Sequence, residues 1–136
     1  MTVDISTFDE LLVAARSQPQ PQRLLFVFAE AGLPEDATAG QRARFEAGEG
    51  GSLTPVICVD KTPDELSTFA ALAGEARQFG TQWAIVFAAG LAGLGGRAPT
   101  SEEAGRQLDR MVESIKAGSI GSFMSFDREG EAMLLD

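Results

Sequence analysis

The residues best suited to hold a small molecule stand where three apolar runs of the sequence end. Glu30 ends the first run, Asp60 and Lys61 end the second, and Arg97 follows the third after a glycine-rich stretch. Ligands of open α/β sheets bind beyond the carboxyl ends of the strands, so parallel strands would bring these side chains to one cleft. Asp60 and Lys61 could then serve as acid and base, while Arg97 clamps an anion. The alternative for each residue is a solvated strand end.

The glycine-rich stretch contains the parts of an anion site. Glycines stand at positions 90, 93, 95 and 96, before Arg97 and a helix start at Thr100. Glycine amides approach a phosphate closely, and a helix N-terminus attracts it. However, the spacing G-x-x-G-x-G-G-R matches neither the dinucleotide fingerprint nor the P-loop, and two glutamates open the helix. The alternative is a surface loop whose leucines tuck under it. The candidate ligand-binding residues are Gly93, Gly95, Gly96, Arg97, Asp60, Lys61 and Glu30.

The composition excludes several kinds of catalytic and metal site. The 136 residues include no histidine, no tyrosine and one cysteine, Cys58. Nucleophile pairs with histidine, histidine metal sites and an internal disulfide are therefore impossible. The adjacent acid pairs at 64–65 and 102–103 lie at helix starts, where the helix dipole explains them without a metal. We expect no metal and no cofactor, and any enzyme here would use carboxylates, Lys, Arg, Ser or Thr.

The charge balance limits the partners. The net charge is −9, from 20 acidic and 11 basic residues. An acidic surface repels nucleic acid and anionic membranes. No apolar stretch has the length of a membrane span, and the first ten residues, MTVDISTFDE, lack the pattern of a signal peptide. We therefore expect a cytoplasmic protein that binds neither nucleic acid nor membrane.

Three capping boxes predict three helices. Thr7 with Glu10, Thr62 with Glu65, and Thr100 with Glu103 each place a capping hydroxyl three residues before a glutamate. The second predicted helix runs from Thr62 to Gly80 and the third ends at Gly118. Apolar residues at helical spacing give each helix a buried face: Phe8, Leu11, Leu12 and Ala15; Leu66, Phe69, Ala70, Leu72, Ala73 and Ala76; Ala104, Leu108, Met111, Val112 and Ile115.

The strands alternate with these helices. Apolar runs at 24–29, 53–59 and 83–89 predict buried strands, and residues 119–126 and 131–136 predict a C-terminal β-hairpin around a turn at 127–130. Cys58 lies in the second run, where we expect a buried, inert thiol. The pattern predicts a single α/β domain over residues 1–136, with one mixed sheet of about five strands and three or four helices. The alternative is a two-layer α+β fold.

Residues 37–47 decide between parallel and antiparallel pairing of the first two strands. If this segment is a helix that packs on the sheet, a right-handed parallel crossover is expected. If it is only a loop, an antiparallel pair is as favourable.

Three stretches resemble a known family: CVDKTPDEL at 58–66, GGRAPTSEEA at 95–104 and RMVESIKAG at 110–118. They are similar to short bacterial proteins often labelled "ribonucleotide reductase subunit alpha", and the resemblance extends from residues 21–29 to 126–130. The catalytic subunit of that name is a far larger barrel protein that uses several cysteines, whereas this chain has Cys58 alone. None of its site residues carries over, so the resemblance implies a small bacterial family and attaches no activity to it.

Two functions are consistent with these observations. The first is a non-enzymatic interaction or regulatory module that binds a protein partner or forms a homodimer, through apolar residues around Leu91, Leu94 or the last strand. The second is an anion-binding protein or a small enzyme with a cleft at the strand ends.

Overall fold

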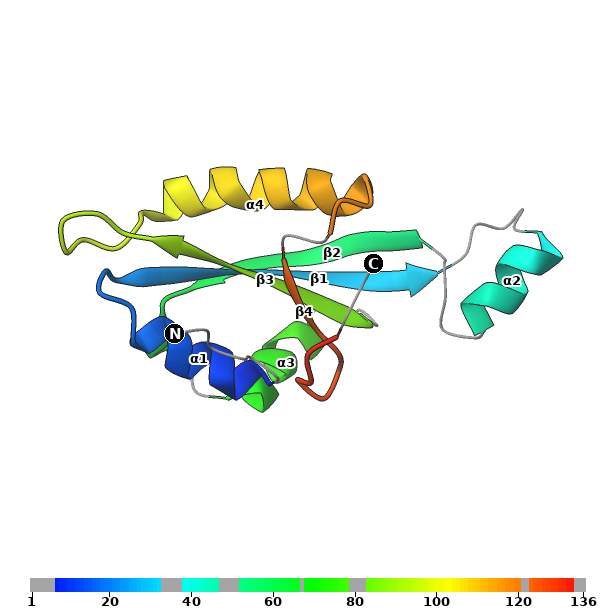
Figure 1. Ribbon diagram of the computed structural model, residues 1–136, viewed down its shortest axis with the longest axis horizontal. Coiled ribbons are helices and arrows are strands. Elements are labelled where there is room, and N and C mark those ends of the chain that lie inside the picture. Colours follow the sequence, from blue (N-terminus) through cyan, green and yellow to red (C-terminus); the bar gives the residue numbers. More distant parts are fainter. Residues whose placement is uncertain are drawn as a thin grey trace.

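The computed structural model describes residues 7–32, 38–46, 52–66, 68–78, 83–120 and 123–133. The fold is α/β, with one open sheet and helices on both of its faces (Figure 1). Helices α1 and α3 lie against one face and α4 lies against the other. The elements in chain order are α1 (Phe8–Arg16), β1 (Gln22–Gly32), α2 (Ala39–Glu46), β2 (Ser52–Lys61), the 3-10 turn η1 (Pro63–Glu65), α3 (Phe69–Arg77), β3 (Ile85–Ala92), α4 (Ser101–Lys116) and β4 (Met124–Phe126).

The sheet has the order β2-β1-β3-β4, and every neighbouring pair is antiparallel. The expected mixed sheet of about five strands is therefore corrected to four antiparallel strands within the described residues. The segment between β1 and β2 gives the reason. It contains a helix, α2, but its described side chains at 39–44 are all exposed and it lies beyond the ends of the strands (Figure 1). A helix that does not pack on the sheet imposes no parallel crossover.

The N-terminus of α2 is capped by local hydrogen bonds. The Thr38 Oγ1 atom accepts a hydrogen bond from the Gln41 amide at 3.1 Å, and the Thr38 amide donates to Gln41 Oε1 at 2.8 Å. This reciprocal pair is a capping box. Of the two alternatives left open for residues 37–47, helix or loop, the structure shows a helix with the narrower bounds of α2.

The two faces of the sheet bury two separate cores. On the first face, α1 and α3 cover a core rich in aromatic rings, in which Phe8 contacts Phe26 and Phe126 and Trp83 contacts Phe28. On the second face, α4 covers the alternate strand residues. The second core consists of Leu25, Val27, Ala29, Ile85, Phe87, Ala104, Leu108, Met111 and Ile115. Both cores follow from the period-two alternation of strand side chains.

Two of the three predicted helix starts are confirmed and one is corrected. Thr7 and Thr100 each accept a hydrogen bond from the amide of the glutamate three residues later. The capping box at Thr62 also forms, but it caps only η1. Leu66 then adopts an extended conformation, and the helix α3 begins at Phe69 with Thr68 as its cap.

A long-range contact accounts for this break. The Arg16 guanidinium donates to the carbonyl oxygens of Pro63 at 3.2 Å and Leu66 at 3.1 Å. The Pro63 carbonyl also accepts from the Leu66 amide at 3.3 Å, which closes the 3-10 turn. The Leu66 carbonyl accepts from Arg16, and the Leu66 side chain is buried in the core. The break also leaves Ala70, expected in the buried face, exposed.

The C-terminal hairpin turns where the sequence predicts it. The Asp127 amide donates to the Glu131 carbonyl at 2.9 Å, and Gly130 has φ of 82°. The returning arm is bridged to β4, since the Met133 amide donates to Ser125 at 2.8 Å, but it is not a regular strand over the described residues. The predicted last strand continues to residue 136, and positions 134–136 lie outside the described residues.

Candidate functional site

The predicted acid and base both form ion pairs with other parts of the fold. Asp60 Oδ2 lies 2.6 Å from a guanidinium nitrogen of Arg23, whose Nε atom also donates to the Pro99 carbonyl at 2.9 Å. The Lys61 Nζ atom lies 3.1 Å from Glu75. These contacts connect β1, β2, α3 and the segment before α4. Asp60 and Lys61 therefore hold elements together at this end of the sheet.

Glu30 lies at the opposite end of the sheet from the other candidates. On β1 it is opposite Thr54, whereas Asp60 is opposite Leu25, five residues earlier. Five strand residues span about 17 Å. The antiparallel topology thus brings Asp60, Lys61 and the glycine-rich stretch to one end of the sheet and leaves Glu30 away from them.

The glycine-rich stretch forms a tight two-residue turn between Leu94 and Arg97, whose backbones exchange hydrogen bonds of 3.0 and 3.1 Å. Gly95 and Gly96 have φ of 61° and 78°, as a type I′ turn requires. The Gly93 amide donates to Pro21, and the Gly96 amide donates to Gln20 Oε1. These amides are occupied within the chain. The Arg97 side chain is exposed and forms no hydrogen bond or ion pair with the described residues.

A cavity of about 500 Å³ lies beside this turn. Its walls come from the end of α1, the segment before β1, η1 and Ala98. Its polar groups mainly hold the walls in place, since Arg16 donates to two carbonyls and Gln18 Nε2 donates to Ala14 at 3.1 Å. The lining residues are Ala15, Arg16, Gln18, Gln20, Pro21, Gln22, Thr62, Pro63, Asp64 and Ala98.

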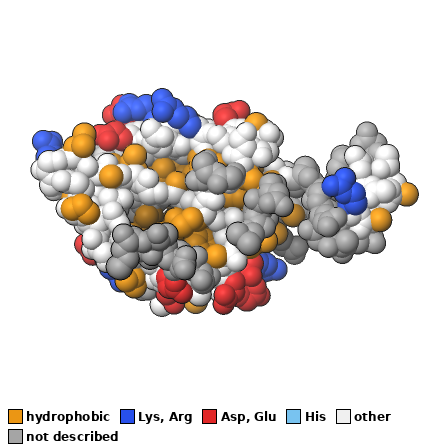
Figure 2. All heavy atoms as spheres, in the orientation of Figure 1, with side chains coloured by type: hydrophobic (Ala, Val, Ile, Leu, Met, Phe, Trp, Pro, Cys, Tyr) orange, Lys and Arg blue, Asp and Glu red, His pale blue; other side chains and the backbone are white. Residues whose placement is uncertain are grey.

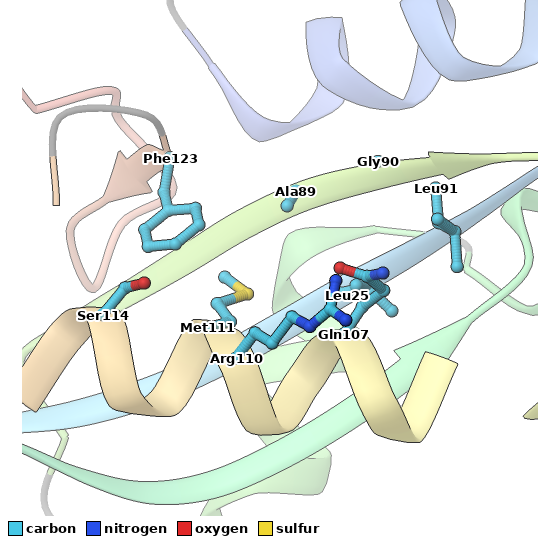
Figure 3. A pocket seen from close by; sticks show the side chains of 9 residues that line it. All are labelled: Leu25, Ala89, Gly90, Leu91, Gln107, Arg110, Met111, Ser114 and Phe123. Atoms are coloured by element: carbon cyan, nitrogen blue, oxygen red, sulfur yellow. The ribbon is translucent and has the colours of Figure 1, made fainter. Parts of the chain in front are cut away.

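A second cavity, which we call the α4–β3 groove, lies between α4 and β3 on the second face of the sheet (Figure 3). Its volume is about 220 Å³. The floor and walls are apolar, and polar side chains of α4 form one rim. The lining residues are Leu25, Ala89, Gly90, Leu91, Gln107, Arg110, Met111, Ser114 and Phe123.

The groove exists because α4 does not cover the whole sheet. The helix packs mainly over β2 and β1, while β3 continues past the short strand β4. Strand β4 pairs only with Val86–Ala88, so among the described residues no strand lies outside the last four residues of β3. The side chains of Ala89 and Leu91 consequently line an open groove (Figure 3).

The direction of the open hydrogen-bonding groups follows from the ladder. Hydrogen-bonded pairs alternate along an antiparallel ladder. The Gly93 amide donates to Pro21 on the β1 side. The backbone N–H and C=O groups of Leu91 and Ala89, two and four positions earlier, therefore also point toward β1. The backbone groups of Gly90 and Ala92 then point away from β1, toward the uncovered side. Both residues are exposed.

Arg110 supplies a positive charge at the rim. It is exposed, and none of the described residues forms an ion pair or hydrogen bond with it. Its side chain extends along the groove beside Gln107 (Figure 3). Figure 2 shows Lys and Arg side chains over α4, above apolar side chains exposed between α4 and α1. The groove therefore combines an apolar floor with a local positive charge on an acidic protein.

No sequence motif marks this groove, although Leu91, which lines it, is among the apolar residues expected at an interface. The third strand was expected to end at Ala89, because the following glycines indicate a loop, and Gly90–Ala92 were therefore expected to form part of a candidate phosphate-binding loop. The available signal was the alternation of Phe87, Ala89 and Leu91, which continues the strand by one further inward residue.

Cys58 lies on the α4 side of the edge strand β2, opposite Val27, and it is exposed. The expectation of a buried thiol is therefore wrong. Partial desolvation, and secondarily the negative charge of Asp109 on α4, raise the pKa of the Cys58 thiol above its ordinary value. A raised pKa keeps the thiol protonated at neutral pH, which lowers its nucleophilicity.

Within the part of the chain that the structure describes, no group of three or more Cys, Asp or Glu side chains is arranged to hold a metal ion. The helices described there are also too short or too polar to cross a membrane.

Comparisons with models of protein families, with curated proteins and with solved structures gave no match.

Proposed function

We propose that this protein is a non-enzymatic interaction module of the bacterial cytoplasm that binds a protein partner through the α4–β3 groove. The observation that carries the proposal is the coincidence of an apolar groove with an uncovered strand edge. Exposed strand edges are sites where proteins add a further strand, and natural proteins usually cover or charge them.

The size of the groove favours a protein partner over a cofactor. Pockets for small molecules usually have volumes of about 300–1,000 Å³, and the groove has about 220 Å³. One or two side chains of a docked segment fill such a volume, whereas a nucleotide is too large to fit in it. The ion pairs of Asp60 and Lys61 add support, because they leave the candidate acid and base engaged in the fold.

Photo-crosslinking in the bacterial host tests the proposal. A photoreactive amino acid at Gln107, on the rim, should yield a discrete crosslinked product. The same amino acid at Glu113, on an exposed position of the same helix, should not. Ser114→Trp places a bulky ring on the groove rim and should abolish the Gln107 product, whereas the neighbouring Glu113→Trp should preserve it. Equal crosslinking from both positions, or none from Gln107, would contradict the proposal.

A second candidate function is an anion-binding site at the 500 Å³ cavity. Its volume lies in the range of ligand pockets, and its wall residues Thr62 and Ala98 adjoin Lys61 and Arg97. Titration with inorganic phosphate, followed by NMR, tests it. Saturable chemical-shift changes of the amides around Arg97, absent in Arg97→Ala, would favour this function. Shifts that are absent, or unchanged in the variant, would exclude phosphate binding there.

A further inference from the structure

We infer that the occupant of the α4–β3 groove is an extended segment of another protein, which adds a strand to the outer edge of β3 and carries an apolar side chain next to a carboxylate. This inference rests on the proposed function and specifies the chemistry of the partner. Three properties of the described residues support it: the direction of the backbone groups at the outer edge of β3, the apolar lining of the groove, and the charge on its rim.

The backbone supplies the binding frame. Gly90 and Ala92 each direct an N–H and a C=O group toward the uncovered side, and both are exposed. An extended segment can pair with both residues and form up to four main-chain hydrogen bonds, as in other cases of β-strand addition. A helix cannot do so, because its own backbone groups are already paired.

Gly90 does not obstruct the edge. It lies opposite Leu24, on the face of α1 and α3, and a side chain there would meet only Gln22 and Leu24 at ordinary contact distance. Strand side chains stand roughly perpendicular to the sheet, so glycine and alanine at this position both allow an incoming backbone at strand spacing, about 4.8 Å.

The groove selects the side chain on the α4 face of the added strand. Successive strand residues alternate between faces, so every second residue of the segment points toward Leu25, Leu91 and Met111. These walls fit an apolar side chain such as leucine, methionine or phenylalanine. The remaining residues of the segment face away from α4.

The charge on the rim selects the next residue on the same face. Arg110 has no partner among the described residues, and a guanidinium binds a carboxylate through paired hydrogen bonds. A carboxylate on a short segment meets the local positive charge of Arg110, whereas a second copy would bring its whole charge of −9 against the −9 of this chain. We therefore favour a different protein with an acidic and apolar segment over a second copy of this chain.

Peptide binding to the purified full chain tests the inference. The probe is a capped eight-residue peptide in which threonine alternates with leucine and aspartate, so that leucine and aspartate share one face. NMR of the labelled protein should show saturable shifts at Gly90, Leu91 and Ala92. A matched peptide with asparagine in place of aspartate should bind about tenfold more weakly.

Two substitutions separate backbone pairing from charge recognition. Gly90→Pro removes the outward N–H without breaking the pairing to β1, and it should weaken binding at least about tenfold, whereas Gly90→Ala should not. Arg110→Gln should abolish the preference for aspartate over asparagine, whereas Arg128→Gln, which removes an equal charge from the hairpin turn, should retain it. A peptide N-methylated at alternate positions should fail to bind the unmodified protein, which tests the pairing even if Gly90→Pro unfolds.

The outcomes distinguish the inference from the proposed function. No shifts at about 1 mM peptide, or binding indifferent to both Gly90→Pro and N-methylation, would overturn the inference. If the Gln107 crosslink in cells persists in Gly90→Pro, the groove still binds a partner but not as an added strand. If the crosslinked product has twice the mass of the chain, the occupant is a second copy and our choice of partner is wrong.

Discussion

At the scale of single residues, the backbone beside the glycine-rich turn packs so closely at Gly93 that no side chain fits there. A Cβ atom at Gly93 would clash with the Arg97 carbonyl oxygen. The turn itself exposes Leu94, whose relative exposure is 86%. The close approach at Gly93, rather than ligand binding, accounts for the glycine at this position.

Gly93→Ala should therefore destabilise the fold by about 1–3 kcal/mol, since the backbone must shift to relieve the clash. Gly105→Ala is the matched control: the added Cβ meets nothing within 4 Å in the middle of α4, and alanine should stabilise the helix by about 0.5–1 kcal/mol. Urea unfolding measures both. Equal effects of the two substitutions would show that the turn adapts freely.

Cys58 gives a second test at the residue scale. Its thiol pKa is raised, first by desolvation and second by Asp109, so alkylation at pH 7–8 should be slower than that of a free cysteine peptide. Asp109→Asn should move the pH–rate profile of alkylation toward lower pH. The profile should not return fully to that of the free peptide, because desolvation still raises the pKa of the thiol. A profile identical to that of the free peptide would contradict the assignment.

The same shift has a consequence for stability. The folded-state pKa lies above the unfolded value, so folding favours the protonated thiol. The contribution of Cys58 to stability is complete below the unfolded pKa and is lost as pH rises through the folded pKa. In Cys58→Ser, this loss of stability at alkaline pH should be absent from the pH dependence of unfolding.

At the scale of elements, Thr68 shows how tertiary contacts select one helix start over another. Both Thr62 and Thr68 have capping geometry, but only Thr68 starts an α-helix. Thr68→Ala should cost about 1 kcal/mol of stability. Ser101→Ala, at an exposed first position of α4, should change stability by less than about 0.5 kcal/mol. A smaller effect at Thr68 than at Ser101 would contradict the assignment of the cap.

The helix α2 provides the opposite case, an element that we expect the fold not to need. Its described side chains are exposed, and β1 and β2 are antiparallel neighbours that a short connection can join. Replacing residues 38–46 by a short Gly/Ser linker should change the free energy of unfolding by less than about 1 kcal/mol, since loop-closure entropy varies slowly with length. Loss of cooperative thermal unfolding would show that α2 packs in solution.

The sequence pattern identified these elements better than their arrangement. Caps and periodicity located α1, β1, α4 and the C-terminal turn, because these signals are local. The pairing of β1 with β2 depends on whether α2 packs, and its composition, with one large apolar residue at position 45, did not decide this. The break before α3 depends on Arg16, which lies about fifty residues away in the chain and leaves no local signal.

At the scale of the whole molecule, antiparallel topology determines which candidate residues meet. A parallel sheet would have placed Glu30, Asp60 and Arg97 at one edge, whereas the observed order separates Glu30 from the other two. The same order leaves β3 longer than its outer neighbour β4 and places α4 toward β2. The α4–β3 groove is thus a product of topology, and no single sequence motif marks it.

The most direct test of the central claim is amide hydrogen exchange by NMR at the outer edge of β3. In the free protein, Gly90 and Ala92 should exchange at least about tenfold faster than Val86 and Ala88, whose outer side is covered by β4. With the partner or the acidic peptide bound, Gly90 and Ala92 should become as protected as Val86 and Ala88. Equal protection of all four amides in the free protein would mean that the edge is already covered, and the account of the groove as a docking site would be wrong.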